Sequence, residues 1–273
     1  MENRKRSGIN RGGDSNKKFY KPVNRPNKED FVFGIQSVLE TLRSGKEIDK
    51  IILQKDIKAF EEIETLAREM GVPVQKAPLE RLNRVTMKNH QGAVAFVSAV
   101  NFANLGNVIT EVFETGEVPL VLILDRITDV RNFGAICRTA ECCGANAIVI
   151  PTRGGAQITG DAMKTSSGAL NFVPICREYD LNQTAEYLRN SGFQIISCTE
   201  KTENSLYSHD YSLPTAIILG SEEDGISDTL LQLSDHSVRI PLKGKVESLN
   251  VSVATGVILY EVLRQREFQK SSS

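Results

Sequence analysis

The stretch IPLKGKVESLNVSVATGVILYEVLRQR, residues 240–266, decides the fold of this chain. Its second half is almost wholly apolar, and the spacing predicts a helix from Leu249 onward. The side chains expected on the buried face of this helix are Leu249, Val253, Val257, Tyr260 and Val262. Three polar residues stand where the helix begins, namely Ser248, Asn250 and Ser252. Their place at the entry to the core needs an explanation beyond packing.

Upstream of this helix, short apolar runs alternate with helical patterns. Strands are predicted at 121–124, 147–150, 172–175, 193–198, 215–219 and 238–240, and helices at 134–143 and 181–190. Apolar strands that alternate with helices are typical of a mainly parallel sheet with helices on both faces. The fold class is therefore α/β, and this larger domain is expected to span residues 119–268.

A smaller α/β unit is predicted over residues 30–100. Helices are expected at 35–42 and 59–70, and strands at 51–53, at 72–75 and after Gly92. Residues 101–118 are interpreted as a linker that holds a short helix near 108–113. Residues 1–29, rich in Lys, Arg and Asn, predict a disordered basic arm, and residues 269–273 a disordered tail.

The net charge of −1 hides an asymmetry along the chain. Residues 1–30 carry nine Lys and Arg against four Asp and Glu, which gives +5 there and −6 for the remainder. A basic segment on a mildly acidic body favours a tether for a polyanion. A solvated tail that aids solubility has the same composition, and both interpretations stay open.

Several other classes of protein find no support in the sequence. Gly155 and Gly160 have the spacing of a phosphate loop, but Asp161 and Ala162 follow where Lys and Ser or Thr are required. Five cysteines without a Cys-x-x-Cys, and three scattered histidines, provide no metal-ligand spacing. No apolar run is long enough to cross a membrane. A cytoplasmic protein without a metal is expected.

Three polar segments each follow a predicted strand, at the edge where open α/β sheets bind ligands. They are residues 125–144, 219–227 and 240–266. Each has a structural interpretation when taken alone: Asn132 as a helix cap, Glu222 as a first-turn carboxylate, and Ser248 and Asn250 as caps of the last helix.

Together the three segments resemble the motifs of the SpoU family of RNA 2′-O-ribose methyltransferases, part of the knotted methyltransferase superfamily. The first motif is Asp125, Asn132-Phe-Gly134 and Arg138, and the second is Gly220-Ser-Glu222-Glu-Asp-Gly225. The third is Ile240-Pro241 followed by Ser248-Leu-Asn-Val-Ser-Val-Ala254. The smaller unit looks like the ribosomal-protein-like substrate-binding domain in front of the ribosomal RNA members.

The resemblance implies a C-terminal deep trefoil knot in which the methyl donor S-adenosylmethionine is bound. Carried over by motif, the cofactor-binding residues are Thr199, Gly220, Ile240, Leu242 and Leu249. The family also implies a homodimer with the knotted region and the last helix at the interface. The polar start of that helix would then line the donor pocket.

The resemblance likewise implies the catalytic residues Asn132, Arg138, Glu222, Ser248 and Asn250. A guanidinium hardly deprotonates, so Arg138 is expected to anchor a phosphate and stabilise alkoxide charge. Asn132 would orient Arg138 and the ribose. Glu222 and Ser248 would complete a polar network around Arg138 and Asn250.

The substrate favoured by the resemblance is a guanosine ribose in large-subunit (23S) ribosomal RNA. A 2′-hydroxyl target excludes DNA. Transfer RNA is the second candidate, and a catalytically silent RNA-binding ribosome-assembly factor on the same fold is a third. Methylation that confers antibiotic resistance uses the same chemistry and stays open as well.

Overall fold

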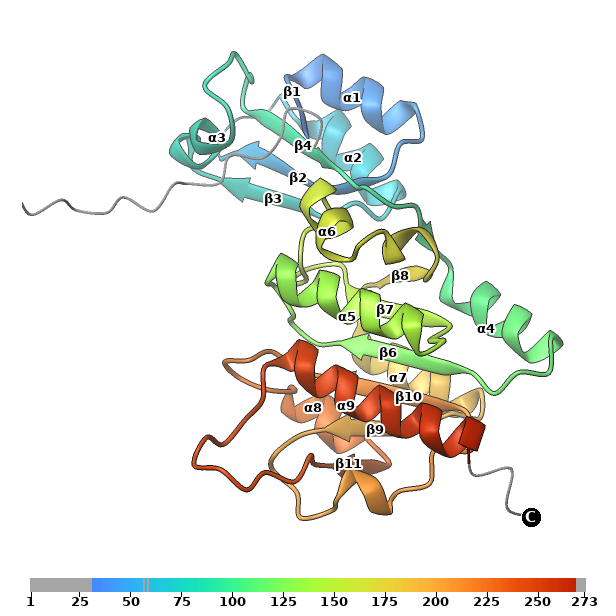
Figure 1. Ribbon diagram of the computed structural model, residues 1–273. Coiled ribbons are helices and arrows are strands. Elements are labelled where there is room, and N and C mark those ends of the chain that lie inside the picture. The colour runs from blue at the N-terminus through green and yellow to red at the C-terminus, as the bar shows by residue number, and fades with distance from the viewer. Residues whose placement is uncertain (1–30, 56, 58, 269–273) are drawn as a thin grey trace, which may run out of the picture.

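The computed structural model describes residues 31–55, 57 and 59–268 of the chain. The predicted basic arm and C-terminal tail lie outside these residues. The described residues form two α/β units, each built on its own sheet (Figure 1).

The smaller unit holds a four-stranded sheet in the order β1-β4-β2-β3. Its strands are β1 (Phe31–Phe33), β2 (Ile48–Gln54), β3 (Val74–Ala77) and β4 (Ala93–Val97), and its helices are α1 (Ile35–Arg43), α2 (Glu61–Glu69) and α3 (Leu79–Val85). Helices α1 and α2 bury one face of this sheet, and α3 covers part of the other. Strand β1 and helix α3 are absent from the prediction.

The segment predicted as a linker carries regular structure. It contains β5 (Phe102–Ala103) and α4 (Leu105–Glu114), and the expected short helix lies within α4. Strand β5 pairs with β8 (Ile175–Glu178) and so adds an edge strand to the larger sheet. The connection therefore packs as part of the larger unit.

The larger sheet has seven strands in the order β11-β9-β10-β6-β7-β8-β5, and every pair is parallel. Its other strands are β6 (Leu120–Leu124), β7 (Ala147–Pro151), β9 (Gln194–Cys198), β10 (Thr215–Leu219) and β11 (His236–Val238). The predicted strand at 172–175 lies too early, since β8 begins at Ile175. The α/β class and the mainly parallel sheet are confirmed.

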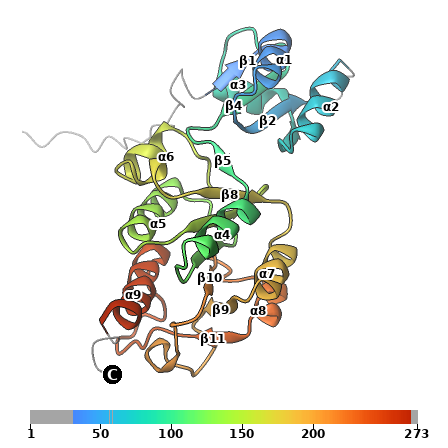
Figure 2. The same cartoon turned by 90° about the vertical axis from the view of Figure 1, so that its right-hand side faces the viewer.

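Helices cover both faces of the larger sheet (Figure 2). One face packs against α5 (Val130–Cys142), α6 (Gly160–Thr165) and α9 (Val251–Leu263), and the other against α4, α7 (Leu181–Asn190) and α8 (Asp228–Leu233). Side chains alternate along β6, so that Leu122 joins the first core and Val121 the second. No helix in the described residues is long and apolar enough to cross a membrane. The trefoil knot stays a prediction.

The prediction of which face α9 buries is only partly correct. Val262 is buried and Val257 packs against the core as expected, but Leu249, Val253 and Tyr260 are 38%, 52% and 57% exposed. Ile258 and Leu259, which the prediction omitted, are fully buried. Helix α9 is apolar on nearly every side, so the packing against α5 and the sheet decides which side is covered. The outer side leaves an apolar surface in this single chain.

A guanidinium holds the end of the chain to the amino-terminal edge of the larger sheet. Arg266 follows α9 and donates hydrogen bonds to four backbone carbonyl oxygens, at distances of 2.7–3.3 Å. These acceptors belong to Val118, Pro119, Tyr211 and Leu213, just before β6 and β10. Burial lowers the pKa of Arg266 to about 10, which leaves the group charged at neutral pH.

Candidate active site

A large hollow opens at the carboxyl ends of β9, β10 and β11. We call it the donor pocket; its volume is about 1090 Å³. Three segments far apart in the sequence line it, residues 198–201, 219–226 and 239–254. All five residues predicted to bind the cofactor are among its lining residues: Thr199, Gly220, Ile240, Leu242 and Leu249. The structure therefore brings the second and third motifs together around one cavity.

The tight turn after β10 requires glycine at position 220. A Cβ atom placed there would lie 2.1 Å from the carbonyl carbon of Gly225 and 2.2 Å from the nitrogen of Ile226. Backbone hydrogen bonds between Ser221 and Gly225 close the turn, and Gly225 has a φ of +70°. No other residue type fits this close approach without moving the backbone.

Two residues at the end of β6 fasten this turn. Asp125 is 5% exposed, and its carboxylate accepts a hydrogen bond of 2.7 Å from the Ser227 backbone nitrogen. Arg126 donates to the Asp224 carboxylate and to the Gly225 carbonyl oxygen. Asp125 appears in the sequence motif, but Arg126 was not among the predicted site residues. Arg126 also has a φ of +58°, which, like its contacts, a sequence pattern does not reveal.

Asn132, Glu222 and Asn250 meet at the mouth of the pocket. The Asn132 side-chain amide donates to Glu222 Oε1 at 3.1 Å, and the Asn250 amide donates to Asn132 Oδ1 at 3.0 Å. Asn250 also donates to Glu222 Oε1. Each of the three motifs contributes one member of this triangle. The structure therefore joins residues that are up to 118 positions apart in the chain.

Of the purely structural roles expected for these side chains, the structure shows one and not the other two. Asp129, rather than Asn132, caps α5, since its carboxylate accepts from the Asn132 backbone nitrogen. Glu222 lies in the turn and in no helix. Asn250 does cap α9, because its Oδ1 accepts from the Ser252 backbone nitrogen. The same side chain thus begins the helix and completes the triangle.

Two predicted catalytic residues stand apart from the triangle. Arg138 is exposed on α5, six residues beyond Asn132, which places it about 9 Å further along the helix axis and on a different side. Ser248 is exposed and lines the donor pocket. Neither makes a hydrogen bond or ion pair with another residue in the described part of the chain. The predicted network therefore contains Glu222, Asn132 and Asn250, but not Arg138 or Ser248.

The backbone around the donor pocket is available to a ligand. Residues 240–249 make no hydrogen bond through their backbone with any other described residue. The Cys198 thiol at the pocket wall is neutral at pH 7, because burial raises its pKa to about 12. A neutral thiol is a poor nucleophile, so it would not compete for an electrophilic methyl group. Free amide groups and a cavity of this size fit a large polar cofactor such as S-adenosylmethionine.

Two family matches cover the two units of the chain. Residues 119–260 match the SpoU rRNA methylase family, and residues 31–103 match the domain described as RNA 2′-O ribose methyltransferase substrate binding. The chain belongs to the SpoU rRNA methylase family. The SpoU family resemblance is thus confirmed for both parts of the sequence, as is the enzyme class, an RNA methyltransferase.

Relatives agree with this placement. The Bacillus subtilis protein YacO, assigned by name to the TrmH family of tRNA/rRNA methyltransferases, is 34% identical over 88% of this chain and 97% of its own length. The SpoU methyltransferase AviRb of Streptomyces viridochromogenes, solved with AdoMet, has a TM-score of 0.56 and 23% identity over 86% of this chain and 90% of its own. A third relative is a TrmH/SpoU tRNA modifying enzyme of A. aeolicus, which is 31% identical and has a TM-score of 0.52. The match covers 61% of this chain and 86% of that enzyme.

The predicted donor, S-adenosylmethionine, agrees with the methylase family to which the chain belongs. Within the described residues, no three His, Cys, Asp or Glu side chains gather into a possible metal site. The expectation that the reaction needs no metal stays a prediction.

Proposed function

We propose that this SpoU family chain transfers a methyl group to a ribose 2′-hydroxyl of RNA. The observation that carries the proposal is the triangle of Asn132, Glu222 and Asn250 at the mouth of the donor pocket. S-adenosylmethionine, when bound there, supplies an electrophilic methyl group. The residues of the chain must then hold the hydroxyl about 3 Å from that carbon and in line with the bond that breaks.

The pocket residues would fix the donor through the backbone. The backbone of residues 240–249, unpaired among the described residues, presents amide and carbonyl groups to the cavity, and the turn at Gly220 also lines it. Leu242 and Leu249 add apolar surface, and Thr199 adds a hydroxyl-bearing side chain to the lining. Backbone recognition of this kind is rigid, because Asp125 and Arg126 restrain the turn that carries it.

The polar residues would act on the ribose and its phosphate. Glu222 accepts hydrogen bonds from Asn132 and Asn250 and so holds both amides at the mouth of the pocket. Arg138 is exposed and has no partner among the described residues, so its guanidinium is suited to bind a phosphate of the RNA backbone. The guanidinium bound to this phosphate would bring positive charge toward the developing alkoxide. We expect Ser248, in the third motif, to contact the ribose.

The substrate we favour is a guanosine ribose in 23S ribosomal RNA. Support comes from the substrate-binding domain over residues 31–103 and from the family's description as rRNA methylases. Transfer RNA is the alternative, since YacO is assigned by name to tRNA/rRNA methyltransferases. A silent binder is less well supported, because pure binding does not require the triangle at the pocket mouth.

The active form we propose is a cytoplasmic homodimer. The exposed apolar side of α9, with Val253 and Tyr260, offers a surface that a second copy would cover. The five cysteines are all free, as expected for a reducing compartment. Sedimentation of the purified chain would give the mass of a dimer, and Tyr260→Glu would give that of a monomer.

The deciding experiment is methyl transfer from tritiated S-adenosylmethionine. Unmodified large-subunit ribosomal RNA and transfer RNA are incubated separately with the protein, and the products are digested with alkali. A 2′-O-methyl group protects the neighbouring phosphodiester, so the label should appear in alkali-resistant dinucleotides from ribosomal RNA.

The other outcomes decide between the alternatives. Label in transfer RNA alone would keep the chemistry and overturn the substrate. Label that is lost from resistant dinucleotides and found on single nucleotides would indicate base methylation instead. Absence of label together with absence of donor binding by calorimetry would support the silent RNA-binding factor.

A further inference from the structure

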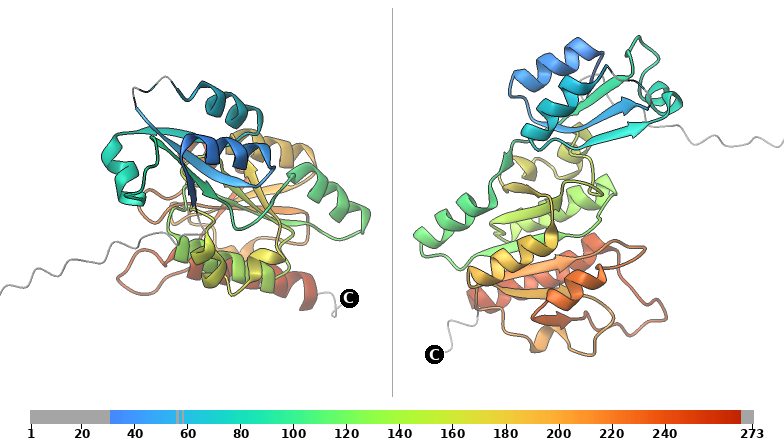
Figure 3. Two further views of the ribbon diagram at one scale, coloured as in Figure 1. Left: turned by 90° about the horizontal axis from the view of Figure 1, so that it is seen from above. Right: turned by 180° about the vertical axis from the view of Figure 1, so that it is seen from behind.

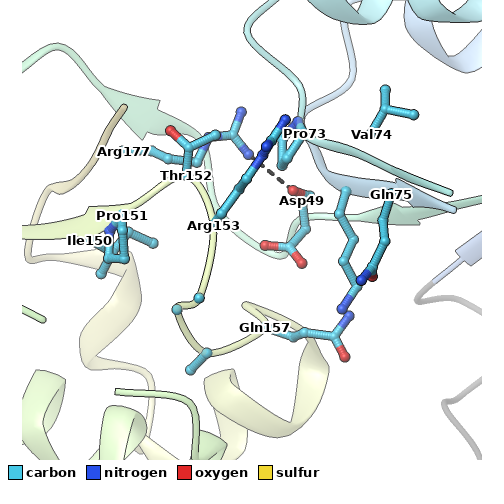
Figure 4. Close-up of a pocket in the computed structure, with 14 residues that line it drawn as sticks. Asp49, Pro73, Val74, Gln75, Ile150, Pro151, Thr152, Arg153, Gln157 and Arg177 are labelled. Atoms are coloured by element: carbon cyan, nitrogen blue, oxygen red, sulfur yellow. Dashed lines mark hydrogen bonds between the residues drawn. The ribbon is translucent and has the colours of Figure 1, made fainter. Parts of the chain in front are cut away.

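A second hollow lies between the two domains. We call it the interdomain hollow; its volume is about 380 Å³ (Figure 4). Residues 49–50 and 73–75 of the small domain form one wall, and residues 150–157, which end β7 and follow it, form the other together with Arg177. Neither the motifs nor the donor pocket includes any of these residues.

Contacts across the domain boundary fix the two walls. The Arg177 guanidinium on β8 donates to the carbonyl oxygen of Ile48 at 2.9 Å and to that of Asp49 at 3.3 Å. The same group lies 4.0 Å from the ring centroid of Phe102 in β5. A backbone hydrogen bond of 2.9 Å joins Ala99 to Ile158. The hollow is therefore a defined cavity with walls from both domains.

Several polar side chains enter this hollow, and the Asp49 carboxylate among them lies beside Gln157 and the Ile158 backbone. Figure 4 shows Asp49 and Gln75 from one domain, and Arg153 and Gln157 from the other, directed into the same space. The Gln157 Nε2 atom is enclosed and lacks a hydrogen-bond partner among the described residues. Arg153 is exposed and likewise unpaired within that part of the chain. An enclosed amide without a partner is costly and therefore points to a ligand.

The chemistry of these groups matches one nucleotide. An amide donor and a carboxylate acceptor, Gln157 and Asp49, suit the hydrogen-bonding edge of a base. Arg153 at the opening suits a phosphate, and Lys50 and Arg177 leave the local charge positive. Tyr179, two residues beyond Arg177, is 84% exposed and offers a ring on which a neighbouring base can stack. The volume lies at the small end of ligand pockets, as expected for a single nucleotide.

The place of the hollow relates it to the donor pocket. Both are lined by residues at the carboxyl ends of strands of the same parallel sheet, which Figure 3 shows from two further sides. Strand β7 lies two strands from β10, which corresponds to about 10 Å at the usual strand spacing. These are the nearest strands that line the two hollows, and a stacked single strand rises about 3.4 Å per nucleotide, so at least about three nucleotides separate the two sites.

We propose that the interdomain hollow is a second RNA subsite that binds one unpaired nucleotide a few positions from the methylated ribose. The base would meet Gln157 and Asp49, and its phosphate would meet Arg153. This inference rests on the proposed function for the identity of the RNA, but not for the existence of the subsite. It makes the orientation of the small domain part of substrate selection.

The test measures binding of unmodified, in-vitro transcribed large-subunit ribosomal RNA to the full chain over a series of salt concentrations. Arg153→Ala and Gln157→Ala should each weaken binding by about 10-fold. For Arg153→Ala, the slope of log affinity against log salt should fall by about 0.7, the value of one phosphate contact on a single strand. Gln157→Ala should leave that slope unchanged, and Arg153→Lys should restore it.

Matched variants outside the hollow separate the subsite from general effects. Arg68→Ala on α2 and Gln183→Ala on α7 remove exposed side chains of the same types and should bind RNA like the wild type. S-adenosylmethionine affinity should stay within 2-fold for all variants. If Arg153→Ala and Gln157→Ala bind RNA as these controls do, the subsite is overturned.

Failure of the subsite and failure of the proposed function give different results. If the chain labels RNA, but Arg153→Ala and Gln157→Ala bind RNA normally, the proposed function is supported and the subsite is overturned. If the chain labels no RNA, but Arg153→Ala and Gln157→Ala change RNA affinity and salt dependence as stated, the subsite is supported and the methyl transfer is overturned. A wild-type chain without affinity for RNA would overturn both.

Discussion

The donor pocket and the interdomain hollow open on the same edge of one sheet, yet they are built differently. The donor pocket is shaped by backbone: a turn that only glycine permits, and a ten-residue segment, 240–249, whose backbone is unpaired among the described residues. The hollow is shaped by side chains from two domains, held in place by Arg177. The backbone site requires particular residues at fixed spacing, whereas the side-chain site can vary with the substrate.

This difference explains which site a sequence motif can reveal. A ligand common to a whole family can be held by backbone atoms, and the chain must then keep Gly220 and its neighbours. A variable RNA sequence must be read by side chains, which have no fixed pattern. The donor pocket would therefore hold the cofactor that all family members share, and the interdomain hollow the RNA sequence that differs between them.

The largest effect should come from Gly220→Ala. The new Cβ would overlap the backbone of Gly225 and Ile226, so the turn must open and donor affinity should fall by at least about 100-fold. Calorimetry with S-adenosylhomocysteine measures this. Gly256→Ala on α9 is the control, because its Cβ would meet nothing closer than 3.9 Å and should leave affinity intact. Normal donor binding by Gly220→Ala would break the distinction between the two sites.

Glu222→Gln should lower turnover by about 100-fold with donor affinity within a few-fold of the wild type. The carboxylate accepts from two amides, and a neutral amide in its place would turn a donor toward Asn132 or Asn250. Single-turnover methyl transfer at saturating donor and RNA measures the rate. Glu141→Gln, an exposed carboxylate at the end of α5, serves as the control. A rate equal to that of this control would remove the triangle from the chemistry.

Arg177→Ala should raise the KM for RNA by about 10-fold and leave donor affinity unchanged. The variant loses two hydrogen bonds to the small domain and the contact with Phe102, so the wall of the hollow is no longer fixed. Steady-state kinetics with RNA as the varied substrate measures the change. Arg189→Ala, which removes an exposed ion pair with Asp235, is the control. A lower kcat with unchanged KM would contradict a role in positioning RNA.

The smallest effect should come from Asp49→Asn. Burial raises the pKa of Asp49, against the attraction of Lys50 and Arg177, so the ionised carboxylate costs stability in the folded state. This cost is present at pH 7 and disappears as the pH falls below the ordinary value of 3.8. Asp49→Asn should therefore raise the thermal midpoint by at most about 3 °C at pH 7, and not near pH 3.8. A lower midpoint at pH 7 would show that the carboxylate stabilises the fold.

Much of the fold could be predicted because its signals are local. The helix at 181–190 and the strand at 215–219 are found where they were expected, since apolar runs with clear ends determine them. Helix α3 has only Leu82 fully buried, so it carries no apolar stripe to detect. The strand predicted at 172 begins later because Phe172 is 76% exposed and belongs to the connection before β8.

Some residues of the candidate sites could likewise be predicted from the sequence and others could not. The members of the triangle and the lining of the donor pocket could be assigned by motif, because their chemistry fixes residue type and spacing. The buried side of α9 could not, since a helix that is apolar all round has no preferred face until its neighbours are placed. Gln157 and Arg177 could not be found either, because only the packing of two domains gives them a role.

The position of Arg266 bears on how the chain is made. Its four carbonyl partners precede β6 and β10, which leave the ribosome well before residue 266 is added. Synthesis proceeds from the amino terminus at about 5–20 residues per second, so those carbonyls wait several seconds for their donor. The amino edge of the larger sheet is therefore completed by a residue that is synthesised after all the strands of that sheet.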